Sequence, residues 1–127
     1  GTIAAEQPYV CHITRMAQTA TETGSGLAYC AAVMKILWNG TTDNWHEGSH
    51  LANACQKAGL DFDLLDGRAR REAAALDSDI EQNQEAQRAA GHWGVPLMVF
   101  ANEPFYGQDR FDLLCWRLSR QGLRKSN

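Results

Sequence analysis

The sequence has no long hydrophobic run, no stretch of basic residues and no Cys-x-x-Cys pair. Its longest apolar segment, Ala28 to Leu37, is interrupted by Lys35 and is too short to span a membrane. The N-terminus has no basic region followed by an apolar core, so we expect no signal peptide. The net charge is −3 over 127 residues, with acidic and basic residues interspersed. These absences argue against a membrane protein and against nucleic acid as a partner.

The four cysteines are far apart in the sequence, and each has apolar neighbours: Cys11, Cys30, Cys55 and Cys115. A free cysteine often behaves as a small buried hydrophobe. Without an export signal, we expect reduced core thiols in a cytoplasmic protein, with two disulfides as the alternative. The composition, 44% hydrophobic and 21% charged, is typical of a globular chain, and the length predicts one domain.

Helical periodicity dominates residues 24–91. Ser25 is a candidate N-cap for a helix that continues to Trp38. Further helices are predicted over residues 43–58 and 61–75, and from residue 77 or 78 to residue 91. Ser78 and Glu81 have the spacing of a capping box at the start of the last one. Earlier in the chain, residues 8–13 form a short apolar segment that fits either a strand or the beginning of a helix.

The pattern changes after residue 91. Residues 96–100 form a continuous apolar run of strand length, and residues 104–106 form a second short strand. A turn at Asn102-Glu103 would join the two strands into a hairpin. Gly107 then begins a final helix that Gly122 ends. Its apolar face is predicted to consist of Phe111, Leu114, Cys115 and Leu118.

A possible metal site lies at residues 46–50, where the sequence reads His-Glu-Gly-Ser-His. His46 and His50 are four residues apart, and this spacing on a helix allows two imidazoles to bind one zinc ion with Glu47 as general base. Gly48 weakens a helix at that point, and no third ligand follows at a typical spacing. A zinc hydrolase is therefore kept only as a third option.

Two strings near the C-terminus resemble motifs of a known family. The first is Gly94-Val95-Pro96 directly before the apolar strand, and the second, residues 103–114, reads EPFYGQDRFDLL. Both resemble the C-terminal half of 2-hydroxychromene-2-carboxylate isomerases and the related kappa-class glutathione transferases. Residues 12–17 and 54–61 are more loosely similar to the same family. The resemblance implies an α/β protein with a DsbA-like thioredoxin fold.

The resemblance also implies how the single domain, residues 1–127, is organised. Residues 1–23 would be an N-terminal segment, residues 24–91 a helical insertion, and residues 92–127 the strand, hairpin and helix that complete a thioredoxin fold. Family members begin with a strand that carries a Ser or Cys at a helix N-terminus. Residues 1–7 do not match this strand, and Thr2 is their only hydroxyl. The expected fold is therefore a truncated one, and no catalytic residue is assigned.

The family implies a site for glutathione. The Val95-Pro96 bond would be cis, and the backbone of Val95 would pair with the cysteinyl part of the ligand. Gln108 and Asp109 would hold its γ-glutamyl end, and Gly107 would allow a close backbone approach. The chemistry agrees, because an ammonium group pairs with a carboxylate and an α-carboxylate with the free N–H groups of a helix N-terminus. The small-molecule thiol ligand is thus predicted to be glutathione.

The absent first strand has a further consequence. Without it, residues 97–101 would expose an apolar strand edge, which favours association with another chain. The four tryptophans also add apolar surface to a chain of this size. This edge could be covered by residues 2–13, by helices or by a second chain, and of these we expect a homodimer. The alternative to a glutathione-binding isomerase relative is a non-catalytic remnant that acts as an oligomerisation or partner-binding module.

Overall fold

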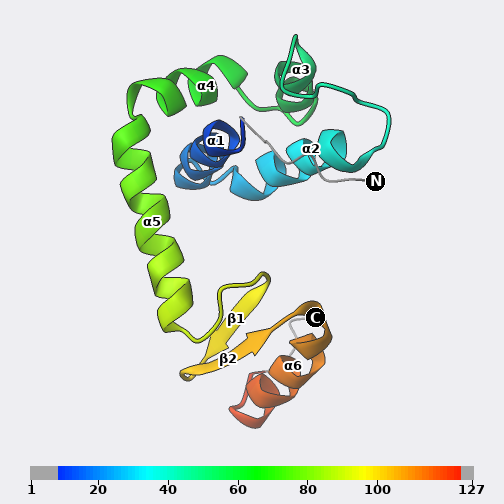
Figure 1. The fold of residues 1–127 in the computed structure, drawn as a ribbon. Helices are drawn as coiled ribbons and strands as arrows, with labels where there is room; N and C mark the ends of the chain where they lie inside the picture. Colours follow the sequence, from blue (N-terminus) through cyan, green and yellow to red (C-terminus); the bar gives the residue numbers. More distant parts are fainter. Residues whose placement is uncertain (1–8, 124–127) are drawn as a thin grey trace. The chain divides into compact units, whose positions relative to one another are not determined.

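The computed structural model describes residues 9–123, and the chain divides into two compact units, residues 1–80 and 81–127 (Figure 1). The division falls within helix α5 (Ala73–Ala89), which contributes residues to both units. Within residues 9–123, no helix is long and apolar enough to cross a bilayer. The chain is mostly helical, with one β-hairpin followed by a C-terminal helix. The expected single domain stays a prediction.

The first unit is built from helices joined by short loops. They are α1 (Val10–Glu22), α2 (Gly26–Trp38), α3 (His50–Lys57), α4 (Phe62–Arg71) and the beginning of α5. Helix α1 packs against α2 and α4, and α3 also packs against both of these helices (Figure 1). Residues 8–13, which fitted a strand or a helix, belong to α1 from Val10 onward, and residue 8 lies outside the described residues.

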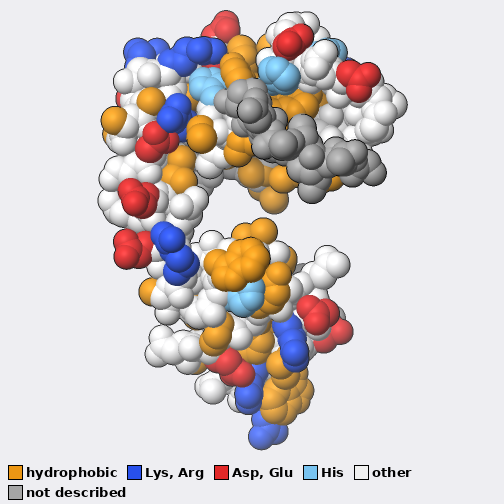
Figure 2. Space-filling view, viewed as in Figure 1, with side chains coloured by type: hydrophobic (Ala, Val, Ile, Leu, Met, Phe, Trp, Pro, Cys, Tyr) orange, Lys and Arg blue, Asp and Glu red, His pale blue; other side chains and the backbone are white. Residues whose placement is uncertain are grey.

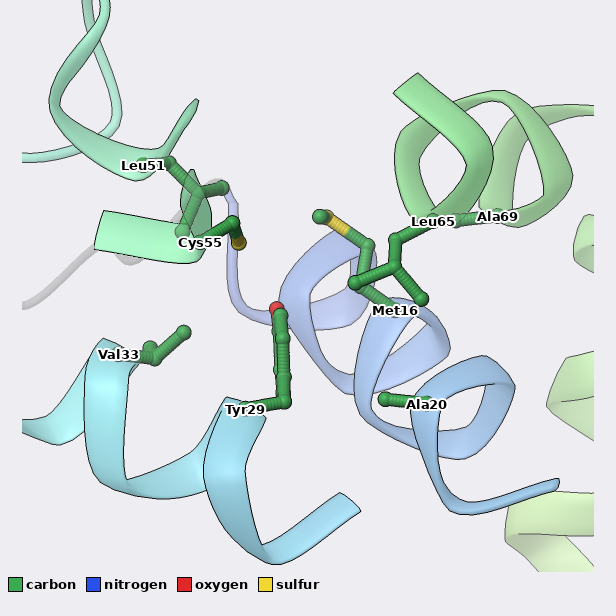
Figure 3. Packing of buried hydrophobic residues seen from close by; sticks show 8 residues of the cluster. All are labelled: Met16, Ala20, Tyr29, Val33, Leu51, Cys55, Leu65 and Ala69. Atoms are coloured by element: carbon green, nitrogen blue, oxygen red, sulfur yellow. The ribbon is translucent and has the colours of Figure 1, made fainter. Parts of the chain in front are cut away.

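Each of the four helices contributes two residues to the core of the first unit (Figure 3). These pairs are spaced four apart, as expected for one face of a helix: Met16 and Ala20, Tyr29 and Val33, Leu51 and Cys55, Leu65 and Ala69. The Tyr29 ring stands at the centre of the cluster, and its hydroxyl donates to the Ile13 carbonyl at 3.0 Å. This bond satisfies the one polar atom that the ring brings into the core. Burial raises the pKa of Tyr29 well above its usual range.

The prediction of a helix over residues 26–38 is confirmed, with Ser25 at the N-cap position. The Ser25 side chain, however, makes no capping hydrogen bond. The predicted helix over residues 43–58 is wrong in its first half, because α3 begins only at His50. Asn44 and Gly48 have φ values of 50° and 59°, which interrupt a right-handed helix. Residues 43–49 therefore form turns.

The boundary between the next two helices also differs from the prediction. Helix α4 is capped by the Asp61 carboxylate, which accepts a hydrogen bond from the Leu64 N–H at 3.0 Å. It ends at Arg71, and α5 begins at Ala73 rather than near residue 78. Residues 73–75 are three alanines, the strongest helix formers, so the helix starts before the expected cap. The predicted capping box at residues 78 and 81 is wrong because both residues lie inside α5.

The second unit contains the predicted hairpin. Strands β1 (Leu97–Phe100) and β2 (Glu103–Tyr106) pair antiparallel, with Leu97 opposite Tyr106 and Phe100 opposite Glu103. The turn residues are Ala101 and Asn102, both with positive φ, as in the turns that match strand twist. The predicted turn at Asn102-Glu103 was one residue too late. A short 3-10 helix, η1 (Gln108–Arg110), then leads into α6 (Phe111–Arg120).

The two faces of the hairpin differ in exposure. Met98, Phe100, Glu103 and Phe105 share one face, because residues two apart in a strand and opposite partners point the same way. Glu103 accepts from Arg117 of α6 at 2.9 Å, so this face points toward α6. Phe105 is only 2% exposed, whereas Val99 and Tyr106 on the other face are exposed. Phe105 is thus the central apolar residue of the second unit.

Three of the four cysteines are not core residues. Cys55 is buried, and burial raises the pKa of its thiol, but Cys11, Cys30 and Cys115 are exposed. All four are free, which leaves the alternative of two disulfides unsupported. The expectation of core thiols was wrong for three residues because apolar neighbours in the sequence need not lie on the buried face of a helix.

Candidate functional site

The loop before β1 has the predicted cis bond between Val95 and Pro96. Gly94, directly before it, is held on both sides. Its carbonyl accepts from Gln87 Nε2 at 2.7 Å, and its N–H donates to His92 Nδ1 at 2.8 Å. The His92 ring stacks on Tyr106, with the ring centroids 3.6 Å apart. These contacts anchor the loop to α5 and to β2.

Val95 is one of the exposed residues of this loop. Its side chain is 79% exposed, and neither its N–H nor its C=O has a hydrogen-bond partner within residues 9–123. Trp93 beside it is also exposed. Figure 2 shows hydrophobic side chains gathered around the histidine of the second unit. The Val95 backbone can therefore pair with an extended peptide segment.

Gly107 connects the end of β2 to this loop. Its N–H donates to the Pro96 carbonyl at 3.0 Å. Its φ is 91°, and a Cβ on Gly107 would lie 2.5 Å from Oδ1 of Asp109. The Asp109 carboxylate thus folds back over Gly107. Glycine is favoured here because a φ of 91° is unfavourable for a residue with a side chain, and a Cβ would displace the Asp109 carboxylate.

The structure brings four of the five predicted site residues together through this arrangement. Asp109 lies in η1, and its carboxylate forms no ion pair or hydrogen bond with another described residue. Gln108 precedes it and is exposed, but its side chain contacts no part of the loop through a hydrogen bond in residues 9–123. The site thus combines an unpaired peptide backbone, a free carboxylate and the first N–H groups of a helical segment.

A family model of the DSBA-like thioredoxin domain matches residues 11–119. The chain belongs to this family. The match extends over parts of both compact units. No curated protein and no solved structure shows a significant match to the chain. The segment at residues 1–7, where the active-site strand of the family was sought, lies outside the described residues.

In this DSBA-like thioredoxin domain, the two histidines of the possible zinc motif do not lie on one helix. His46 lies in the turns before α3 and His50 is the first residue of that helix, so the two do not share a helical face. The His46 ring instead contacts the rings of Trp45 and Tyr9. Among the residues that the structure describes, no three His, Cys, Asp or Glu side chains are grouped to hold a metal. The helical spacing on which the zinc option rested is therefore absent from residues 46–50.

The sequence interpretation missed a charged network in the first unit. Nε2 of His12, which is buried, lies 2.7 Å from Oδ1 of Asp66, and Arg70 donates two hydrogen bonds to the same carboxylate. The Arg70 bonds, and then the His12 bond, lower the pKa of Asp66 despite its partial burial. The spacing of Asp66 and Arg70 on a helix was a visible signal for their pair. No sequence signal indicated the hydrogen bond between Asp66 and His12, which are 54 residues apart.

Proposed function

We propose that the chain binds glutathione at the Val95-Pro96 loop. The observation that carries this proposal is the exposed Val95, whose backbone N–H and C=O have no partner in residues 9–123. The cysteinyl residue of glutathione has one N–H and one C=O of its own. In an antiparallel arrangement, these two groups satisfy both free groups of Val95.

The γ-glutamyl end of the ligand would meet the beginning of η1. Its ammonium group pairs with the free Asp109 carboxylate, which already folds back toward the loop. Its α-carboxylate accepts from the first N–H groups of the helical segment, which have no intrahelical partner. The bond between Gly107 and Pro96 holds these two parts of the site next to each other. Gln108, which precedes Asp109 in η1, would add a further hydrogen bond.

Calorimetric titration with glutathione tests this site. We expect Asp109→Asn to weaken binding by about tenfold or more, because a charge-assisted hydrogen bond contributes about 1.5–3 kcal/mol. Asp112→Asn is the matched control, since it removes an exposed carboxylate from the next helical turn. S-methylglutathione should bind in the same way, because the proposed contacts do not involve the thiol. Absence of saturable binding, or equal losses in the two variants, would show that this site is wrong.

The reaction proposed with this site is that of a glutathione-dependent 2-hydroxychromene-2-carboxylate isomerase. The bound thiolate adds to a conjugated C=C bond, and the displaced electron pair moves to the carbonyl oxygen as an enolate. Rotation about the new single bond follows, and return of the electron pair expels the thiolate. Val95, Pro96, Gly107, Gln108 and Asp109 would bind and orient glutathione. We assign none of them to lowering the pKa of the thiol.

A second candidate function is self-association, as an oligomerisation module. It is favoured by a row of large apolar side chains on α2, at residues 27, 34 and 38, that are all exposed. Trp38 alone is 75% exposed. Their spacing of seven and four residues places them on one side of the helix, opposite the buried Tyr29 and Val33. Two copies of the chain would bury this row against itself in a symmetric dimer.

Light scattering at micromolar concentration tests the dimer. We expect a mass of twice the monomer for the wild-type chain and the monomer mass for Trp38→Glu, because a buried unpaired charge opposes the interface. Leu64→Glu, at an exposed leucine of α4 outside the row, should leave the dimer intact. A monomeric wild-type protein at this concentration would exclude the second candidate.

A further inference from the structure

A pocket of about 630 Å³ lies between α2 and α3, entirely within the first unit. Its walls are the facing sides of the two helices and the start of the loop that joins them. Five alanines form much of the lining: Ala28, Ala31, Ala32, Ala54 and Ala58. Their short side chains leave open space beside the packed core. The volume is within the range that accommodates small organic ligands.

The ionisable side chains that line this pocket are all basic. Lys35 on α2 and Lys57 on α3 line it, together with His50, and no Asp or Glu belongs to its lining. The chain has only three lysines and a net charge of −3. Two of these lysines line one pocket, so its local charge is positive although the chain as a whole is negative. Neither lysine forms an ion pair with a carboxylate in residues 9–123. Both ammonium groups are therefore available to an anion.

The rim of the pocket carries further hydrogen-bonding side chains, those of Asn39, Thr42 and Asn53. Hydrogen bonds to nearby residues hold each of them in place. Asn39 Nδ2 donates to the Thr42 hydroxyl at 2.9 Å, and Asn39 Oδ1 accepts from the Thr42 N–H at 3.0 Å. Because the Thr42 oxygen acts as acceptor in the first bond, its own hydrogen can be donated to a ligand. On the other wall, Asn53 Nδ2 donates to Ser49 at 3.2 Å and retains a second N–H. The polar groups around an alanine floor thus offer mainly donors.

We propose that this pocket binds a small organic anion with a compact apolar body. The anionic group, a carboxylate or a phosphate, would lie between Lys35 and Lys57, and the apolar body would cover the alanine floor. This site is independent of the proposed glutathione site, because every residue that lines it belongs to the first unit. The donors on the rim match an anion, since a carboxylate or phosphate oxygen only accepts hydrogen bonds.

Titration with 2-naphthoate, 2-naphthyl phosphate and the uncharged 2-naphthylmethanol tests the proposal at low ionic strength. We expect one saturable site for at least one of the two anions, with the alcohol about tenfold weaker or more. The stronger of the two anions identifies the preferred head group. Lys35→Gln and Lys57→Gln should each weaken binding by about threefold, because exposed ion pairs contribute little individually, and the double variant by about tenfold.

Arg71→Gln is the charge-matched control, because it removes an exposed positive charge of the same unit outside the pocket. Its affinity for the anion should equal that of the wild type. Amide resonances of Ala31 and Ala54 should shift on binding, which locates the ligand between the two helices. The proposal would be overturned by the absence of saturable binding for both anions. Equally strong binding of the alcohol, or an unchanged affinity in the double lysine variant, would overturn it as well.

Discussion

Phe105→Ala is expected to unfold the second unit locally and to cause the largest loss of stability in that part of the chain. Phe105 is 2% exposed and lies on the hairpin face that points toward α6. Truncation of a buried phenylalanine costs about 3–5 kcal/mol, because transfer free energy is lost and a cavity remains. Amide hydrogen exchange of β1 and β2 should therefore become about 100-fold faster or more.

The same substitution should remove glutathione binding, because the bond between Gly107 and Pro96 depends on the end of β2. Val99→Ala provides the control within the hairpin, since Val99 is half exposed on the opposite face. We expect this control to cost no more than about 1 kcal/mol and to retain the site. Similar exchange rates in the two variants would mean that Phe105 is not the central residue of the unit.

Asp66→Ala should be the most damaging single change to a charged group in the first unit. Its carboxylate accepts hydrogen bonds from the buried His12 and from Arg70, and hydrogen bonds to charged groups contribute about 1.5–3 kcal/mol. Because Arg70 is exposed enough to be solvated, we expect a loss of about 2 kcal/mol, mainly from the unsatisfied His12. Urea unfolding followed through the amides of α1 and α4 measures this loss.

The effect of Asp66→Ala should also depend on pH. The pKa of Asp66 is lowered in the folded chain, so the stabilisation is fully present above the unfolded value of about 4. It is lost as the pH falls through the lower folded value. The difference between wild type and variant should therefore be largest near neutral pH and shrink below pH of about 4. Asp79→Ala, at an exposed carboxyl of α5, should change stability little at any pH.

Several backbone features around the candidate site have local signals in the sequence. Pro96 before an apolar run indicated the turn into β1, and Gly107 marked the start of the last helical segment. The cis bond that the resemblance implied and the predicted hairpin are both confirmed. The bond that joins Gly107 to Pro96 depends on the observed register, with Leu97 opposite Tyr106, which the turn predicted one residue too late would not have given.

Predictions failed where the outcome depended on distant residues or on single backbone angles. The helix predicted from residue 43 starts only at His50, because the left-handed backbone at Asn44 and Gly48 leaves no continuous turn for the two histidines. Three cysteines predicted as core thiols are exposed, because the packing of neighbouring helices selects which face is buried. Hydrophobic periodicity carries no information on these choices.

The sequence by itself determined helix α2, the hairpin and the last helix, together with glycine and proline positions near their ends. These features follow from periodicity and from backbone angles, which a few adjacent residues specify. Only the tertiary structure decided that His12 meets Asp66, that Asp109 folds over Gly107, and that Lys35 and Lys57 share one pocket. Such contacts depend on how separate elements pack, because each side chain's neighbours across the fold are set by many residues together.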